Sequence, residues 1–379
     1  MARYRAYVSD VSYFSGKLET ALRARRIDYD RVTITPRVLL DEVLPNTGWM
    51  KVPALRRDDG RWLCDTTPLL RWLDREHPQR TLIPADPYRA FLSTLIEDYC
   101  DEWQWRSAMF WRWAWPDNAR YLGSRLGREL SRGTVHPAWA MGLYFRKRQQ
   151  RIYLRGDGVR ADNFAAIAAL YPQTLGWLEA LLNGRRFLLG ARPSLVDVAW
   201  MGPMFRHFAQ DPRPAALMAE RAPRVWAWVA RLWNAGSEDW ADAALDDFGD
   251  PAWNPLFADI GAAYLPYLHD NAAAVASGAA RFAGSYGGIR YADLPAIRYR
   301  ARCLNTLQAA YRDLGDAVRA AVDARLAGSG IVECLRRPGA APTLPVIDRA
   351  EGRACRIGGA QRLRFYFTGT PWDAATEDS

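Results

Sequence analysis

The chain has 379 residues, which is enough for two or three domains, and its 49% hydrophobic and 25% charged content is typical of a globular protein. The net charge of +9 suggests a nucleic-acid partner, but 48 of the 51 basic residues are arginine and no groove-reading motif accompanies them. We therefore expect no nucleic-acid partner. We also expect no membrane partner, because no apolar run reaches the roughly 18 residues of a membrane span.

The metal-ligating residue types are too scattered to form a site. Neither a Cys-x-x-Cys motif nor a Cys/His cluster occurs, so we expect no metal and no disulfide framework. The cysteines are Cys64, Cys100, Cys303, Cys334 and Cys355, and the histidines are His77, His136, His207 and His269. The chain starts with Met1-Ala2-Arg3 and no apolar signal segment, which predicts a cytoplasmic location.

The first 84 residues predict an α/β domain. Residues 4–8 read as a strand, residues 16–25 as a helix with Leu18, Ala21 and Leu22 turned inward, and residues 28–34 as a second strand. A hairpin follows, since residues 52–55 and 62–63 flank the turn signal Asp58-Asp59-Gly60.

The next helix starts at an acid–hydroxyl pair. Asp65 and Thr66 stand where side-chain oxygens cap exposed amides, and Leu69, Leu70 and Leu73 follow at helical spacing. One interpretation of the pair is therefore a helix cap without a ligand.

The order of these elements, together with Val52-Pro53 and Asp65-Thr66, resembles the glutathione-binding half of the glutathione transferase superfamily, a thioredoxin-like fold. The resemblance implies that Val52 and a cis Pro53 offer backbone hydrogen bonds to the cysteinyl part of glutathione. It implies that Asp65 and Thr66 hold the γ-glutamyl end, with Thr67 as a fallback ligand. Lys51 is within reach of the glycyl carboxylate, although an exposed lysine at a strand end is equally ordinary. Glutathione would be a co-substrate, with no other cofactor.

Ser12 is the candidate catalytic residue. The segment 12–22 resembles the serine- and cysteine-type transferases, in which a hydroxyl or thiol stands at the start of the first helix. A hydroxyl that donates to sulfur, beside the positive end of a helix, favours the reactive thiolate. The alternative is that Ser12 only caps the helix. Ser9, Ser15 and Tyr7 are rival hydroxyls. Position 12 holds no cysteine, which argues against chemistry that needs a mixed disulfide.

The neighbouring segment Lys17-Leu18-Glu19 favours a second hypothesis. It resembles metaxin-like and failed-axon-connections-type proteins, which share the fold but in which conjugation is less secure. The chain would then be a non-catalytic binding or assembly module.

A second, all-α domain is predicted over residues 86–245. Asp86-Pro87 opens a long helix, and Trp103, Arg106, Phe110 and Trp113 fall on one of its faces. These four side chains are candidates for the pocket of an apolar or aromatic electrophile, with packing between domains as the alternative.

Further along, Ser194 and Asp197 form a capping box like the one that opens the buried helix of the transferase α domain, a structural role. Helices are also expected over residues 152–154, 163–182 and 223–235.

Residues 250–379 form an extension that matches no motif of the family. Helical patterns cover residues 257–280 and 297–326, a loop is expected over 338–345 and a late strand over 363–368. The extension has three candidate roles, which are packing on the α domain, closing the pocket, and association. Family members commonly form homodimers, and the extension is large enough to block that surface.

Overall fold

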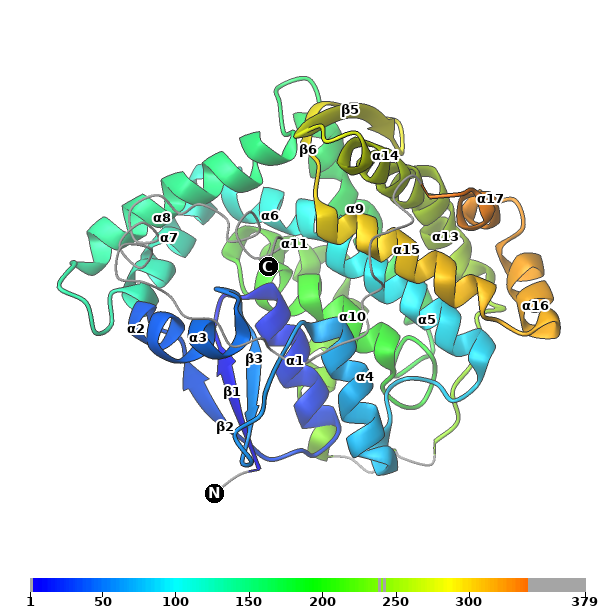
Figure 1. Cartoon of the computed structure of the whole chain (residues 1–379), viewed down its shortest axis with the longest axis horizontal. Helices are drawn as coiled ribbons and strands as arrows, with labels where there is room; N and C mark the ends of the chain where they lie inside the picture. The colour runs from blue at the N-terminus through cyan, green and yellow to red at the C-terminus, as the bar shows by residue number, and fades with distance from the viewer. Residues whose placement is uncertain (1–2, 238–239, 241–242, 340–379) are drawn as a thin grey trace.

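The computed structural model describes residues 3–237, 240 and 243–339 of the chain. A mixed sheet with its helices comes first, a larger set of helices second, and a helical segment with one hairpin third (Figure 1). The sheet lies at the lower left of Figure 1, and the third part lies along the top and the right. The expected fold class, a thioredoxin-like domain followed by an all-α domain and a mainly helical extension, is confirmed.

The sheet has four strands in the order β2-β1-β3-β4. They are β1 (Tyr4–Val8), β2 (Tyr29–Thr33), β3 (Ala54–Arg57) and β4 (Trp62–Cys64). β1 runs parallel to β2 and antiparallel to β3, which pairs antiparallel with β4. The predicted strands and hairpin are confirmed, and Gly60 has the positive φ of 86° that its tight turn requires.

The alternation of β1 sends its side chains to two different cores. Tyr4, Ala6 and Val8 join the main core, together with the inward faces of α1 (Tyr13–Ala24) and α4 (Thr66–Glu76). Tyr7 points to the other side, into a smaller cluster that the segment with α2 and α3 covers. These short helices are α2 (Pro36–Val38) and α3 (Leu44–Thr47), joined by the π-helical residues Leu39–Val43.

The long helix expected from residue 86 onward is confirmed. It consists of α5 (Pro87–Tyr99) and α6 (Trp105–Trp113), joined by the π-helical segment Cys100–Gln104. The other helices of this part are α7 (Pro116–Leu130), α8 (Ala138–Tyr153), α9 (Phe164–Leu181), α10 (Leu195–Pro203), α11 (Pro212–Arg221) and α12 (Pro223–Trp233), with π-helical residues Met204–Phe208 after α10. The capping box forms as predicted, because the Asp197 carboxylate accepts the Ser194 amide at 3.0 Å.

The extension packs on α5. Two reciprocal hydrogen bonds join them: the Tyr264 hydroxyl donates to Asp98 at 2.5 Å, and the Tyr99 hydroxyl donates to Asp259 at 2.6 Å. Of the three candidate roles, packing on the α domain is therefore observed. The elements of the extension are α13 (Asn254–Asp259), the π-helical residues Ile260–Tyr264, α14 (Leu265–Ala276), β5 (Arg281–Tyr286), β6 (Ile289–Pro295), α15 (Arg298–Arg312), α16 (Asp316–Leu326) and α17 (Ile331–Arg336).

One element of the extension was not predicted, and two predicted elements lie partly or wholly outside the described residues. The β5–β6 hairpin was not predicted. The predicted strand 363–368, and the predicted loop from residue 340 onward, lie outside the described residues. Among the described helices, none is both long enough and apolar enough to cross a bilayer.

Candidate functional site

The register of the sheet brings the predicted site elements to one edge. Tyr7 pairs with Ala54, which in turn pairs with Cys64, so these three residues form a row across β1, β3 and β4. One step beyond this row lie the end of β1, Pro53 before β3, and Asp65 after β4. The Val52–Pro53 peptide bond is cis, as predicted. Residues that are distant in sequence therefore meet next to the loop that carries Ser12.

Ser12 is the accessible hydroxyl among the candidates in this segment. It is half-buried, whereas Ser9, Ser15 and Tyr7 are buried. Each rival also has a structural partner. The Tyr7 hydroxyl donates to Glu42 at 2.8 Å, Ser15 Oγ accepts the Ser9 amide, and Ser9 Oγ accepts the Val11 amide.

Ser12 also caps α1, so the structural interpretation of this residue is confirmed. Its Oγ accepts the backbone amide of Ser15 at 3.3 Å. This bond uses an acceptor position and leaves the hydroxyl proton free to donate. No acceptor for that proton is found among the residues that the structure describes. Capping and donation to a ligand are therefore compatible at Ser12.

Asp65 stands at the start of α4 with an unusual backbone. Its φ of 66° is uncommon for a residue other than glycine, and such conformations concentrate at functional sites. The carboxylate makes no cap hydrogen bond of good geometry to its own helix, although the Thr67 backbone amide lies close enough to act to lower its pKa. Instead the Tyr299 hydroxyl, from α15 of the extension, lies 3.1 Å and 3.0 Å from its two oxygens. The strongest polar contact of Asp65 is therefore with the extension rather than with its own helix.

The electrostatics around Asp65 combine burial with a buried cation. Burial raises the pKa of Asp65 to about 6, although the Tyr299 hydrogen bond and the Lys17 ammonium both act to lower it. Lys17 itself is fully buried in α1 and pairs with Glu97 at 2.8 Å and Asp101 at 2.6 Å. Burial opposes the lysine charge, but the two carboxylates raise the pKa of Lys17 overall.

The remaining predicted ligands flank this edge. Thr66 is buried at the first turn of α4, and the Thr67 hydroxyl donates to Asp101 at 3.3 Å. Val52 is half-buried, and Lys51 is exposed with its ammonium 5.3 Å from the centre of the Trp49 ring. The structure therefore gathers Ser12, Val52, Pro53, Asp65 and Thr66 around one edge, with Lys51 at its margin.

Comparison with known proteins agrees with this arrangement. Residues 7–81 match the family model of the glutathione S-transferase N-terminal domain, and residues 161–231 match the model of the C-terminal domain. The chain belongs to the glutathione S-transferase superfamily. Together the two models account for the sheet with its helices and for α9 to α12, and both lie outside the extension.

The individual relatives match the chain either over a short stretch or at low identity. A probable maleylacetoacetate isomerase of Drosophila melanogaster is 32% identical over 93 residues, which are 23% of this chain and 37% of that protein. The match therefore spans little more than a third of the curated relative.

Solved structures of bacterial proteins overlap with about two thirds of the chain. A glutathione S-transferase from Rhodospirillum rubrum is 20% identical, with a TM-score of 0.40, and covers 67% of this chain and 91% of its own. The β-etherase LigF of a Sphingobium strain is 18% identical, with a TM-score of 0.43, and covers 67% of this chain and 98% of its own.

The predicted electrophile pocket needs correction in this superfamily member. Trp103, Arg106, Phe110 and Trp113 are all buried, with at most 3% of their surface exposed. Trp103 packs against tyrosines of the extension, among them Tyr267 at a ring distance of 5.4 Å. Arg106 pairs with Asp157 at 3.0 Å, and Phe110 and Trp113 lie in the helical core. The aromatic face of the long helix therefore serves packing, which was the alternative.

The extension adds a residue that sequence reasoning missed. Tyr299 reaches Asp65 from α15, and next to it Arg300 pairs with Glu102 at 2.8 Å. Asp65 and Tyr299 are 234 residues apart, and no local pattern links them. The extension thus contributes directly to this edge of the sheet.

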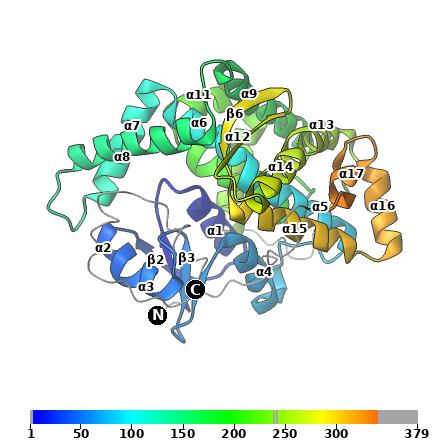
Figure 2. The same cartoon turned by 45° about the horizontal axis from the view of Figure 1, so that its top comes forward.

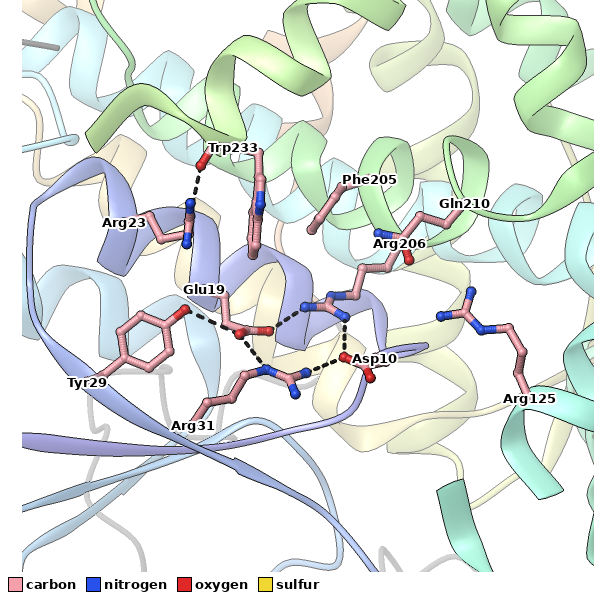
Figure 3. A pocket seen from close by; sticks show the side chains of 10 residues that line it. All are labelled: Asp10, Glu19, Arg23, Tyr29, Arg31, Arg125, Phe205, Arg206, Gln210 and Trp233. Carbon is pink, nitrogen blue, oxygen red and sulfur yellow. Dashed lines mark hydrogen bonds and ion pairs between the residues drawn. The ribbon is translucent and has the colours of Figure 1, made fainter. Parts of the chain in front are cut away.

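Ion pairs and core packing explain the segment Lys17-Leu18-Glu19. Lys17 pairs with α5, Leu18 lies in the core, and the Glu19 carboxylate pairs with Arg31 at 2.9 Å and with Arg206. Glu19 borders a cavity of about 490 Å³ at the β2 side of α1, and Figure 3 shows its ion pairs crossing that cavity. The cavity is lined by Asp10, Glu19, Arg23, Tyr29, Arg31, Arg125, Phe205, Arg206, Gln210 and Trp233, none of which is a predicted ligand.

Among the described residues, no group of three or more His, Cys, Asp or Glu side chains is placed to hold a metal ion.

Proposed function

We propose that this protein binds glutathione at the edge of its thioredoxin-like sheet and transfers the thiolate to an electrophile. One observation carries the proposal. The strand register brings Pro53, Asp65 and the loop with the accessible Ser12 hydroxyl to the same edge, beside the N-terminus of α1. A thiol held there would meet a hydroxyl donor and the positive end of a 12-residue helix.

Each part of the tripeptide has a proposed partner. The backbone of Val52 and Pro53 would pair with the cysteinyl residue, and Asp65 and Thr66 would hold the γ-glutamyl end. Lys51, exposed beside this edge, would reach the glycyl carboxylate. Lys17 favours the ionised form of Asp65, because its ammonium acts to lower the pKa of that carboxyl.

The chemistry proposed for Ser12 is stabilisation of the thiolate. Its hydroxyl would donate to sulfur and lower the pKa of the bound thiol, so that more of it is ionised at neutral pH. The electrophile is apolar or aromatic in our proposal, but the buried Trp103 and Phe110 do not form its pocket. The maleylacetoacetate isomerase relative supports a glutathione-dependent isomerisation as an alternative reaction at the same site.

Calorimetric titration of glutathione into the wild-type protein and into Asp65→Ala tests the proposal. We expect the wild type to bind and the variant to lose binding, with a smaller change in the free energy of unfolding. Asp30→Ala, which removes an exposed carboxylate from β2, should bind like the wild type. A well-folded wild type that does not bind glutathione would refute the proposal.

A non-catalytic module is the second candidate, and one observation favours it. The Tyr299 hydroxyl occupies hydrogen-bonding positions on Asp65 that the first proposal assigns to glutathione. If this contact only narrows the site, Tyr299→Phe will bind glutathione more tightly than the wild type. If neither protein binds glutathione, the module is the supported function.

A further inference from the structure

The α7–α8 arm, residues 116–155, carries most of the net charge of the chain. It contains nine arginine or lysine residues and two acidic residues, whereas the other 339 residues contain 42 basic and 40 acidic residues. The rest of the chain is also rich in arginine, but acids balance it there. A general preference for arginine therefore does not explain the excess in the arm.

The arm is a closely packed helical hairpin that projects from the molecule. Figures 1 and 2 both show α7 and α8 extending on the side away from α16 and α17. The two helices approach at glycines: a Cβ added to Gly127 would lie 2.1 Å from the carbonyl oxygen of Ala138, and one added to Gly142 would lie 2.6 Å from that of Gly123. This backbone contact holds the helices together and leaves their outer faces to solvent.

The tip of the arm exposes apolar side chains. Val135, in the loop, is 95% exposed, and Trp139, in the first turn of α8, is 74% exposed. Exposed apolar side chains grouped in this way mark interaction sites more often than single ones do.

The outer face of α8 changes from apolar to basic along its length. Trp139, Leu143, Lys147 and Arg151 follow one another at four-residue steps, and all four are exposed. Neighbouring positions add the exposed Tyr144 and the half-buried Arg148. One face therefore presents an apolar end at the tip and cations behind it.

We propose that the α7–α8 arm docks on an anionic phospholipid surface. Val135 and Trp139 would enter the interface between headgroups and acyl chains, and Lys147 and Arg151 would lie against the phosphates. Amphipathic basic helices with exposed tryptophan bind anionic bilayers in this manner, and each cation near the surface adds attraction. The expectation of no membrane partner rested on spanning segments and did not consider a charged arm.

Two other partners fit the arm less well. Single-stranded nucleic acid would stack on Trp139 and Tyr144, but it does not account for the exposed aliphatic side chains Val135 and Leu143. A second copy of the arm would bring two surfaces of net charge +7 together, which like-charge repulsion opposes.

Flotation of the full-length protein with vesicles tests the proposal. We expect binding to vesicles of phosphatidylglycerol mixed with phosphatidylcholine, little binding to pure phosphatidylcholine, and weaker binding as salt rises. Lys147→Glu combined with Arg151→Glu should lower the affinity about tenfold or more. The matched control, Arg75→Glu with Arg221→Glu, reverses two exposed arginines outside the arm and should leave affinity within about twofold.

A second pair of variants tests the contribution of the apolar side chains to vesicle affinity. Val135→Ser with Trp139→Ser should lower the affinity about fivefold or more, whereas Trp226→Ser, at a 42% exposed tryptophan elsewhere, should not. Wild-type protein that ignores anionic vesicles, or controls that lose as much affinity as the arm variants, would overturn the proposal. Preferential binding of polyuridylate would overturn it in favour of nucleic acid, and a dimer that dissociates on Trp139→Ser would overturn it in favour of self-association.

Discussion

Asp65 sets the expected pH dependence of glutathione binding. Burial raises its pKa to about 6, and the proposed contact with the γ-glutamyl end requires the ionised carboxylate. We expect the dissociation constant for glutathione to increase as pH falls through 6, by about tenfold per unit well below it. Calorimetric titrations between pH 5 and 8 measure this, and Asp65→Asn should bind weakly with no such dependence. A flat profile for the wild type would contradict the role of Asp65.

The same carboxyl affects folding in the opposite direction. Its pKa is raised above the ordinary value of 3.8, so its contribution to stability is complete below 3.8 and is lost as pH rises through about 6. Burial also raises the pKa of Asp98, to about 7, which adds a contribution of the same sign. As pH rises through 6 to 7, we therefore expect glutathione to bind more tightly. Over the same range Asp65 and Asp98 should contribute less to the free energy of unfolding.

Ser12→Ala separates catalysis from binding. The hydroxyl is proposed to donate to the thiolate, so its loss should raise the pKa of bound glutathione thiol by about 1 to 2 units and slow conjugation at neutral pH about 10- to 100-fold. Affinity for glutathione should stay within about twofold. Ultraviolet titration of the bound thiolate measures the shift. Ser15→Ala, at a buried rival, is expected to alter stability rather than the thiol pKa, and the reverse result would assign the role to Ser15.

At the scale of residues, the sequence predicts what local motifs encode. Ser12 at the helix start and the Ser194–Asp197 capping box follow from patterns within a few residues, whereas cis Pro53 follows from the family resemblance; the structure agrees with all three. Tyr299 does not follow from such a pattern, because its contact with Asp65 depends on how a distant helix packs. The same packing buries Trp103, which periodicity alone could not distinguish from a pocket wall.

At the scale of elements, the errors have identifiable causes. The β5–β6 hairpin was missed although Gly287-Gly288, between two alternating segments, is a turn signal with positive φ at both residues. The arm was missed although α7 carries an apolar stripe that packs on α8, because glycines interrupt the helical pattern of both helices; the stripe is Ala119, Leu122, Leu126 and Leu130. Both elements carried signals, but the signals were weaker than those of the sheet.

Gly127→Ala tests whether this glycine contact holds the arm together. The added Cβ would lie 2.1 Å from a backbone oxygen, so the helices must separate, and we expect a loss of about 2 kcal/mol or more in the free energy of unfolding. Gly176→Ala is a matched control, since Gly176 is an exposed position within α9 with open space around it. There alanine should stabilise the protein by about 0.5 to 1 kcal/mol. Urea denaturation measures both, and equal effects would contradict the packing described for the arm.

At the scale of the whole molecule, the extension is part of one continuous core. A single cluster of buried side chains runs from Tyr4 in the sheet through the long helix to Leu335 in α17. The sequence predicts the start of the extension near residue 250 from a change of motif. It could not show that residues after 250 complete the packing of α5, because the reciprocal bonds of Tyr264 and Tyr99 join residues about 160 positions apart.

This continuity predicts one cooperative unfolding transition. A chain of 379 residues does not generally unfold in two states, so coincident curves from far-ultraviolet circular dichroism and tryptophan fluorescence would be informative. Tyr264→Phe removes a hydrogen bond between the extension and α5, and Tyr7→Phe removes one within the thioredoxin-like domain. Each should lower the free energy of unfolding by about 1 kcal/mol and shift both signals together. If the extension were an independent domain, Tyr7→Phe would leave its transition unchanged, and two separate transitions would then be resolved.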